Sequence, residues 1–284
     1  MKFHLLVIFF IFSFSSSFSQ LYTGQLINKE SGQPIPFVNI GLLGRNIGTV
    51  TDTAGWFNLE LDSEFDQDTI CLSCVGYSSR KYVVYEFKDT IRSTGKVKFE
   101  LSPIAYRLNE VIIRPVEFKT YTLGNFCVAN SAYGNAFYSK LLGTEIGIVI
   151  NLPQRKQKAF LKNFRFFVGE FTFDKFPVRL NIYDLKNGLP NENILQEPIY
   201  IIITSVGEYI IDLEKYNINT NGDFFISLEY YEIADKTEGK LIFCAVHNRK
   251  MNKSNGYYRL TSHGNWQRER FDNVGFSVQV DCEK

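Results

Sequence analysis

The chain has 284 residues, of which 45% are hydrophobic and 21% are charged. That apolar share supports a folded core and excludes wholesale disorder, and the length suits one large domain or two of ordinary size. Thirty-one Lys and Arg residues balance 30 Asp and Glu residues, which removes the electrostatic argument for a nucleic-acid partner. The 26 Phe and 16 Tyr residues favour β structure, because aromatic side chains suit half-buried pleated surfaces.

The first 19 residues have the pattern of a secretory signal peptide. Lys2 precedes a short apolar run from Leu5 to Phe14, and Ser17 and Ser19 place small side chains before a cleavage point at Gln20. Serines end the run well short of the roughly 20 apolar residues that span a bilayer. The sequence therefore predicts export with cleavage after Ser19, and a product in the periplasm, at the outer membrane or outside the cell.

Five cysteines follow this cleavage point, at positions 71, 74, 127, 244 and 282. An odd number leaves at least one thiol unpaired in an exported monomer. Cys71 and Cys74 have CxxC spacing, but they lie in a strand-like run, where residues three apart point to opposite faces. No second CxxC motif or nearby His completes a zinc site. We expect ordinary buried cysteines here, and we expect no metal and no other cofactor.

Short strand-like runs alternate with turn residues from Leu21 to Leu101, as in a small β-sandwich. The expected strands are Tyr22–Ile27, Phe37–Leu42, Trp56–Leu61, Asp68–Cys74 and Lys81–Tyr85. Asp52 and Gly55 predict a hairpin turn, because Asp accepts backbone N–H groups and Gly tolerates a positive φ.

This part of the chain resembles a known family. The resemblance rests on Gly24, Pro34-Ile35-Pro36-Phe37-Val38-Asn39-Ile40, Gly48-Thr49-Val50-Thr51-Asp52, Gly55-Trp56-Phe57, Ser73 and Gly76-Tyr77, in that order. These residues resemble a carboxypeptidase-regulatory-like domain over about residues 21–101, and the expected first domain spans residues 20–101. The resemblance implies a transthyretin-like Greek-key β-sandwich without catalytic residues, of the kind that precedes TonB-dependent receptors and occurs in other envelope proteins of Bacteroidetes.

Residues 102–118 are expected to form a linker or a bridging strand, in which Leu108–Pro115 resembles the segment that follows this module in the receptors. Residues 119–284 predict a second β-sandwich, of jelly-roll type, so the fold class expected for the whole chain is all-β. The expected strands are Ile146–Asn151, Leu161–Val168, Val178–Tyr183, Ile199–Thr204, Tyr209–Leu213, Phe224–Tyr230, Lys240–Val246, Tyr257–Thr261 and Val274–Val280. A short helix is expected only around Ser139–Leu142.

Two of these strands have informative patterns. Val178–Tyr183 alternates apolar and polar side chains, which predicts a strand with one face in water. Ile199–Ile203 is apolar throughout, which predicts a central strand. This run has the length of a buried strand and is far too short to span a bilayer, so we expect no transmembrane segment in the mature chain.

Catalytic motifs are not evident in the sequence. His247 and His263 are the two histidines after the leader, and both lie in polar or turn-like surroundings that predict surface positions. No Gly-x-Ser-x-Gly elbow or His-Glu-x-x-His motif occurs. Paired carboxylates could still support glycoside hydrolysis. The candidate acids are Asp212, Glu214, Asp223 and Glu229.

The sequence thus favours an exported, non-enzymatic envelope protein whose two sandwiches serve structural or interaction roles, with an envelope protein or a glycan as partner. One alternative is a carbohydrate-binding protein that stacks exposed aromatic rings on sugars. Its candidate residues are Trp266, Tyr257 and Tyr230. The other alternative is a glycosidase-like enzyme, which requires two facing carboxyl groups in a cleft of the second domain.

Overall fold

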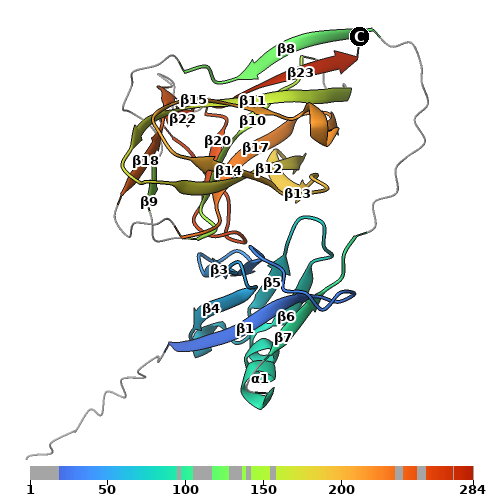
Figure 1. The fold of residues 1–284 in the computed structure, drawn as a ribbon, viewed down its shortest axis with the longest axis vertical. Helices are drawn as coiled ribbons and strands as arrows, with labels where there is room; N and C mark the ends of the chain where they lie inside the picture. Colours follow the sequence, from blue (N-terminus) through green and yellow to red (C-terminus); the bar gives the residue numbers. More distant parts are fainter. Residues whose placement is uncertain are drawn as a thin grey trace, which may run out of the picture.

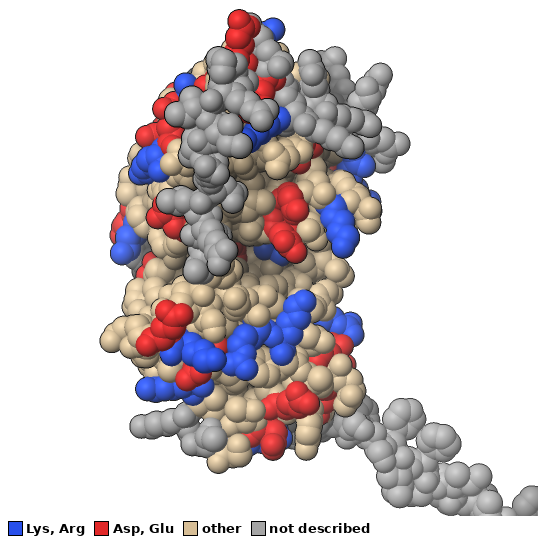
Figure 2. Space-filling view, turned by 90° about the vertical axis from the view of Figure 1, so that its right-hand side faces the viewer, with Lys and Arg blue, Asp and Glu red and all other residues tan. Residues whose placement is uncertain are grey.

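A computed structural model describes residues 19–94, 97–104, 117–127, 136–138, 142–153, 158–233, 239–247, 254–270 and 272–283. Strands dominate this part of the chain, and they form two β-sandwich domains stacked one on the other (Figure 1). The expected all-β fold class is confirmed. Figure 2 shows a band of Lys and Arg side chains across the first domain, close to its boundary with the second.

The first domain packs a three-stranded sheet, of order β4-β1-β7, on a four-stranded sheet, of order β3-β2-β5-β6. The strands are β1 Gln20–Asn28, β2 Asn39–Leu42, β3 Gly48–Val50, β4 Trp56–Leu61, β5 Thr69–Ser73, β6 Arg80–Val83 and β7 Lys98–Leu101, with a 3₁₀ turn η1 at Ser63–Phe65. Alternate side chains from both sheets meet in one core, which includes Leu26, Ile40, Phe57, Leu72 and Phe99. The domain is a transthyretin-like sandwich, as the resemblance implied.

The tight turn before β4 forms as the sequence predicts, but the expected hairpin was wrong, because β3 pairs with β2 and β4 pairs with β1 in the other sheet. The side chain of Asp52 accepts the backbone N–H groups of Ala54 (2.9 Å) and Trp56 (2.8 Å). Gly55 has φ of +75°, and a Cβ atom there would lie only 2.7 Å from the carbonyl oxygen of Leu26. Glycine is therefore required at this position, both by the backbone conformation and by the close approach of β1.

A helix, α1 (Val84–Thr94), follows β6. The expectation of a strand over Lys81–Tyr85 was wrong from Val84 onward. Val84 and Phe87 are buried in the core, and Ile91 packs against it. This spacing of three and four residues is the helical period, which lets one face of α1 cover the end of the sandwich.

The second domain packs two larger sheets face to face. One has the order β13-β12-β17-β10-β20-β21, with β14 also on β12; the other has the order β8-β23-β11-β18-β9, with β15 and β16 on β11. Strands β19 and β22 form a separate pair. The bounds are β8 Phe118–Gly124, β9 Ala136–Tyr138, β10 Glu145–Ile150, β11 Lys158–Phe171, β12 Phe176–Lys186, β13 Leu189–Asn193, β14 Ile199–Ile203, β15 Gly207–Asp212, η2 Glu214–Tyr216, β16 Asn219–Asn221, β17 Phe224–Tyr230, β18 Lys240–Phe243, β19 Ala245–His247, β20 Gly256–Arg259, β21 Gln267–Arg268, β22 Asp272–Val274 and β23 Ser277–Glu283.

Two expectations for this domain were wrong. Strand β14 lies at an edge, paired with β12, and its alternate residues are exposed. Strand β12 has no wet face, because both Arg179 and Asn181 are buried. The jelly-roll type and the boundaries between domains stay predictions. Leu108–Pro115 and residues 139–141 of the expected short helix lie outside the described residues, and Leu142 lies in a turn.

A disulfide joins Cys127, which follows β8, to Cys244, which lies between β18 and β19. Cys71 and Cys282 are buried free thiols, and Cys74 is a half-buried one. Within the described ranges, no helix has the length and apolar character needed to cross a membrane.

Candidate functional site

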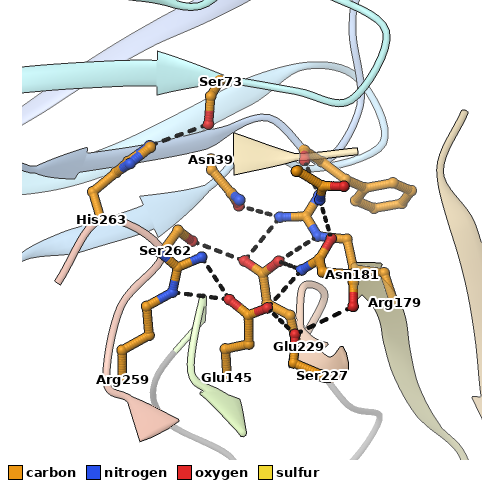
Figure 3. Close-up of polar contacts among 12 residues, drawn as sticks. Asn39, Ser73, Glu145, Arg179, Asn181, Ser227, Glu229, Arg259, Ser262 and His263 are labelled. Atoms are coloured by element: carbon orange, nitrogen blue, oxygen red, sulfur yellow. Dashed lines mark hydrogen bonds and ion pairs between the residues drawn. The ribbon is translucent and has the colours of Figure 1, made fainter. Parts of the chain in front are cut away.

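Four charged side chains form a row across the outer face of the β10–β12–β17–β20 sheet (Figure 3). Strand pairing places Arg179 of β12 opposite Glu229 of β17, Glu229 opposite Glu145 of β10, and Glu145 opposite Arg259 of β20. Their exposed fractions are 3%, 0%, 0% and 9% in that order along the row. We call these four residues the charged row.

Strand alternation explains why these side chains share one face. Val178 and Leu180 of β12, Leu228 of β17 and Ile146 of β10 point into the core between the two sheets. Since successive side chains of a strand point to opposite faces, their polar neighbours must point outward. The charged row is therefore a cross-strand ladder, one residue from each of four neighbouring strands.

Each carboxylate in the row has its own guanidinium partner. Arg179 donates to both oxygens of Glu229, from Nε to Oε2 (2.7 Å) and from the Nη2 atom to Oε1 (2.9 Å). Arg259 donates from Nε to Oε2 of Glu145 (2.8 Å). Two-pronged contacts of this kind are stronger and more directional than contacts between neutral groups.

The two carboxylates lie directly opposite each other, an arrangement that like charges disfavour. Polar neighbours offset this repulsion. The amide of Asn181 donates to both Glu145 (3.0 Å) and Glu229 (2.7 Å). The hydroxyl of Ser227 donates to Glu145, and that of Ser262 donates to Glu229 (2.9 Å). The pair is therefore hydrogen-bonded on all sides, as buried charges must be.

The electrostatics of the row keep Glu229 ionised. Burial alone would raise the pKa of this carboxyl, but the charge and hydrogen bonds of Arg179, with Arg259 and Asn181, lower it to about 2. Burial works to lower the pKa of Arg179, whereas the Glu229 charge raises it above its ordinary value. This pair stays charged through the physiological pH range.

Arg179 also reaches across to the first domain. Its Nη1 atom donates to the carbonyl of Phe37 (2.7 Å), and its Nη2 atom donates to the side-chain oxygen of Asn39. The backbone of Phe37 has φ of +58°, a conformation that bulky side chains rarely adopt, and its ring lies edge-on to Tyr231 at 4.6 Å. We call Phe37, Asn39, Arg179 and Glu229 the interdomain clasp.

His263 makes a second contact between the domains. Its Nε2 atom lies 3.2 Å from Oγ of Ser73, and its carbonyl accepts the N–H of Gly44 (2.9 Å). Burial, followed by the nearby charge of Arg259, lowers the pKa of His263 to about 3. The surface position expected for His263 was wrong, because the loop that carries it packs against the first domain. The side chain of His247 lies outside the described residues.

Small residues let the two domains approach closely. A Cβ atom on Gly48 would lie 3.3 Å from Cβ of Thr261 and 2.8 Å from the carbonyl oxygen of Ile40. The Thr261 hydroxyl donates to the carbonyl of Arg45 (3.1 Å), and the Asn265 amide donates to the neighbouring carbonyl of residue 44 (3.0 Å). The loop after β20 thus lies directly on the β2–β3 hairpin.

Of the four candidate acids, only Glu229 belongs to the charged row. Asp212 accepts the backbone N–H of Glu214 (3.0 Å), and Glu214 pairs with Lys162 at 3.2 Å. Asp223 accepts the backbone N–H of Leu152 (2.8 Å). The partner carboxylate, Glu145, was missed. The one sequence feature that could have pointed to Glu145 is its position as a single acid directly before the apolar strand expected at Ile146–Asn151.

The three aromatic candidates have different surroundings. Tyr230 was a wrong choice: it is 0% exposed, and its ring stacks on Phe176 inside the core at 4.5 Å. Trp266 is half-buried, 4.9 Å from the ring of Phe225, with the guanidinium of Arg259 4.5 Å from its own ring centre. Tyr257 is half-buried and lies 6.3 Å from the same Phe225. Trp266 and Tyr257 therefore both lie near Phe225, whereas Tyr230 lies apart from them in the core.

The described part of the chain has no group of three or more His, Cys, Asp or Glu side chains arranged to hold a metal ion. The charged row offers no free lone pairs to a cation, since Arg, Asn and Ser donors occupy both carboxylates. The charged row instead links four neighbouring strands of the second domain, and Arg179 links that domain to the first.

Comparison with known families agrees with the architecture of the first domain. Residues 22–113 match the CarboxypepD_reg-like domain. The first domain is a CarboxypepD_reg-like domain. The match extends past β7 and ends before β8, so all four residues of the charged row lie outside it. Phe37 and Asn39, which accept hydrogen bonds from Arg179, lie within the matched residues.

The matched residues end before the first described strand of the second domain. A search of the curated proteins found no match. One solved structure that the chain matches is titled "Structure of infectious bursal disease virus Gx strain". The two chains are 8% identical with a TM-score of 0.16, and the alignment covers 94% of this chain and 65% of the viral chain. A similarity of this size supports no conclusion about fold or function.

Proposed function

We propose that this chain is an exported, non-catalytic binding scaffold of the cell envelope, in which two β-sandwich domains act as one rigid body. The observation that carries the proposal is the position of Arg179, whose single guanidinium contacts Glu229 in its own domain and Phe37 and Asn39 in the other. A rigid pair of domains holds loops and sheet edges in a fixed arrangement, which is what a binding surface requires.

Two features support export. The first 19 residues have the order of a secretory leader: a basic residue, an apolar run and small residues. The Cys127–Cys244 disulfide joins residues 117 positions apart. Disulfides of this structural kind persist in oxidising compartments and are rare in the cytosol. Both features support the same compartment.

The state of the paired carboxylates favours a scaffold over a glycosidase. Glycoside hydrolysis needs one carboxylic acid that keeps its proton near neutral pH and a cleft that admits the sugar. Glu229 instead has a pKa of about 2, and neither Glu145 nor Glu229 has exposed surface. This pair therefore gives the glycosidase alternative no support.

The test is to express the full chain with a C-terminal tag in a bacterium that has an outer membrane, beside a variant that lacks residues 1–19. The proposal expects a mature N-terminus at Gln20, recovery in the envelope fraction, and cross-linking to an envelope component in intact cells. The truncated variant should stay in the cytosol without these cross-links. An unprocessed cytosolic protein, or equal cross-linking of both forms, would contradict the proposal.

A glycan is a second candidate for the bound partner, favoured by the half-buried Trp266 and Tyr257, whose rings both lie near Phe225. The measurement is retention of the purified mature chain on cell-envelope polysaccharides. If the second domain binds sugars, Trp266→Ala abolishes retention while Trp56→Ala, at the 38% exposed tryptophan of the first domain, does not. Equal retention of wild type and both variants would remove this candidate.

A further inference from the structure

Strand β14 (Ile199–Ile203) leaves one edge of a sheet open. It pairs with β12 along one side, and no other strand in the described part of the chain pairs with it. The strand backbone carries N–H and C=O groups in both directions, so the open side presents groups that can pair with another strand.

The composition of β14 distinguishes it from the other edges. Proteins commonly protect exposed edges with charged residues, which oppose pairing with another chain. Among the described edge strands of four or more residues, every one except β14 carries a charge. These charges include Glu60 in β4, Arg80 in β6, Lys98 in β7, Lys119 in β8, Glu192 in β13 and Glu208 in β15.

The outward side chains of β14 are apolar and held in place. Tyr200 is 40% exposed and Ile202 is 47% exposed. The inward residues Ile199, Ile201 and Ile203 are buried in the core, which fixes the strand against the sheet. The ring of Tyr200 also packs against Tyr231 at 4.8 Å. An apolar edge that is already ordered loses little conformational freedom when another strand pairs with it.

We propose that two copies of this chain associate through β14, as antiparallel strands related by a two-fold axis at Ile201. This register places Tyr200 of one copy opposite Ile202 of the other, an aromatic and β-branched pair of the kind that stabilises sheets. It also places Glu197 opposite Ser205 of the second copy, so no like charges meet. Because the strand is uncharged and self-complementary, a second copy fits it without any change of sequence.

Sedimentation equilibrium of the mature chain measures this association directly. The proposal expects the wild type to form a dimer. In Ile202→Lys the dissociation constant should rise at least about tenfold, because each copy then brings one lysine to the paired β14 strands. A tenfold rise corresponds to about 1.4 kcal/mol. The matched control is Ile210→Lys, at a 60% exposed residue on the charged edge strand β15, which should dimerise like the wild type. Circular dichroism checks that both variants fold.

Hydrogen exchange of the unmodified chain gives an independent measurement. Backbone amides of residues 199–203 should exchange more slowly as protein concentration rises, while those of β15 should not change. A monomeric wild type, a dimer that Ile202→Lys leaves unchanged, or exchange at β14 that does not depend on concentration would each overturn the proposal. Pairing of β14 with a strand of a different protein, in place of a second copy, would also overturn the proposal.

Discussion

Arg179 and Glu229 face each other from neighbouring strands, with Nε 2.7 Å from Oε2, and both are almost completely buried. The remaining donors of Arg179 point away from its own domain, to the carbonyl of Phe37 and the side chain of Asn39. If the domains separated, these donors would lose their partners. Water would replace those partners, and a hydrogen bond from a charged group is worth about 1.5–3 kcal/mol net of that exchange, so the contacts of Arg179 oppose separation of the domains.

Removing one partner of the pair should destabilise the fold strongly. Arg179→Met leaves the Glu229 carboxylate buried without a counterion, and we expect a loss of about 3–5 kcal/mol in the free energy of unfolding. The double variant Arg179→Met with Glu229→Gln should lose less than the sum of the two single losses, because it removes both charges. Urea unfolding of the four proteins measures this coupling.

The exposed pair Arg165 and Glu208 is the matched control, with side chains 48% and 38% exposed. Arg165→Met should cost no more than about 1 kcal/mol, because solvent screens exposed ion pairs. Equal losses for the buried and exposed substitutions, or additive losses in the buried cycle, would show that the clasp does not hold Arg179 as described.

Acid should destabilise the protein through His263. The unfolded chain binds a proton there below the ordinary pKa of 6.5, whereas the folded chain does so only near pH 3. Stability is therefore lost as pH falls below 6.5, at a rate of up to about 1.4 kcal/mol per pH unit for one proton. Glu229 adds a further loss as pH falls from its ordinary value of 4.5 toward about 2.

The check is the free energy of unfolding measured between pH 7 and pH 5. His263→Gln should flatten this part of the profile, because it removes the group that titrates there. A wild-type profile that is flat in this range, or one that His263→Gln does not change, would contradict the role assigned to the His263 contact.

Loss of the disulfide should also be measurable. The bond closes a loop of 117 residues, and removal of a native disulfide typically costs about 2–4 kcal/mol by freeing the unfolded chain. Cys127→Ser should therefore unfold at lower urea concentration than the wild type under oxidising conditions. Under reducing conditions the two proteins should behave alike. A Cys282→Ser variant serves as a control for the loss of a thiol that is not disulfide-bonded.

Much of the fold could be predicted from the sequence because its signals are local. Alternation marked β12, and Asp52 with Gly55 marked the tight turn before β4, where each side chain acts on its own backbone neighbours. The same alternation predicted a water-facing side chain at Arg179, and this prediction was wrong. A polar strand face looks identical in sequence whether water or a second domain covers it.

The parts of the candidate site that the sequence did not predict are formed by contacts between residues far apart in the chain. Glu145 and Glu229 are 84 positions apart and meet only through strand pairing, which no local pattern encodes. Tyr230 and Trp266 are both aromatic residues in strand-rich surroundings, yet one stacks on Phe176 in the core and the other lies near the surface beside Arg259. The helix α1 did have a local signal, because Val84, Phe87 and Ile91 are spaced at the helical period.

The central claim, that the two domains form one rigid unit, can be tested with the two tryptophans of the chain, Trp56 in the first domain and Trp266 in the second. Trp266→Phe and Trp56→Phe each leave one fluorescent reporter, so urea unfolding can be followed in each domain separately. The account predicts coincident transitions that separate when Asn39→Ala removes a contact of the clasp. Transitions with different midpoints in the two single-tryptophan proteins, without any change to the clasp, would contradict it.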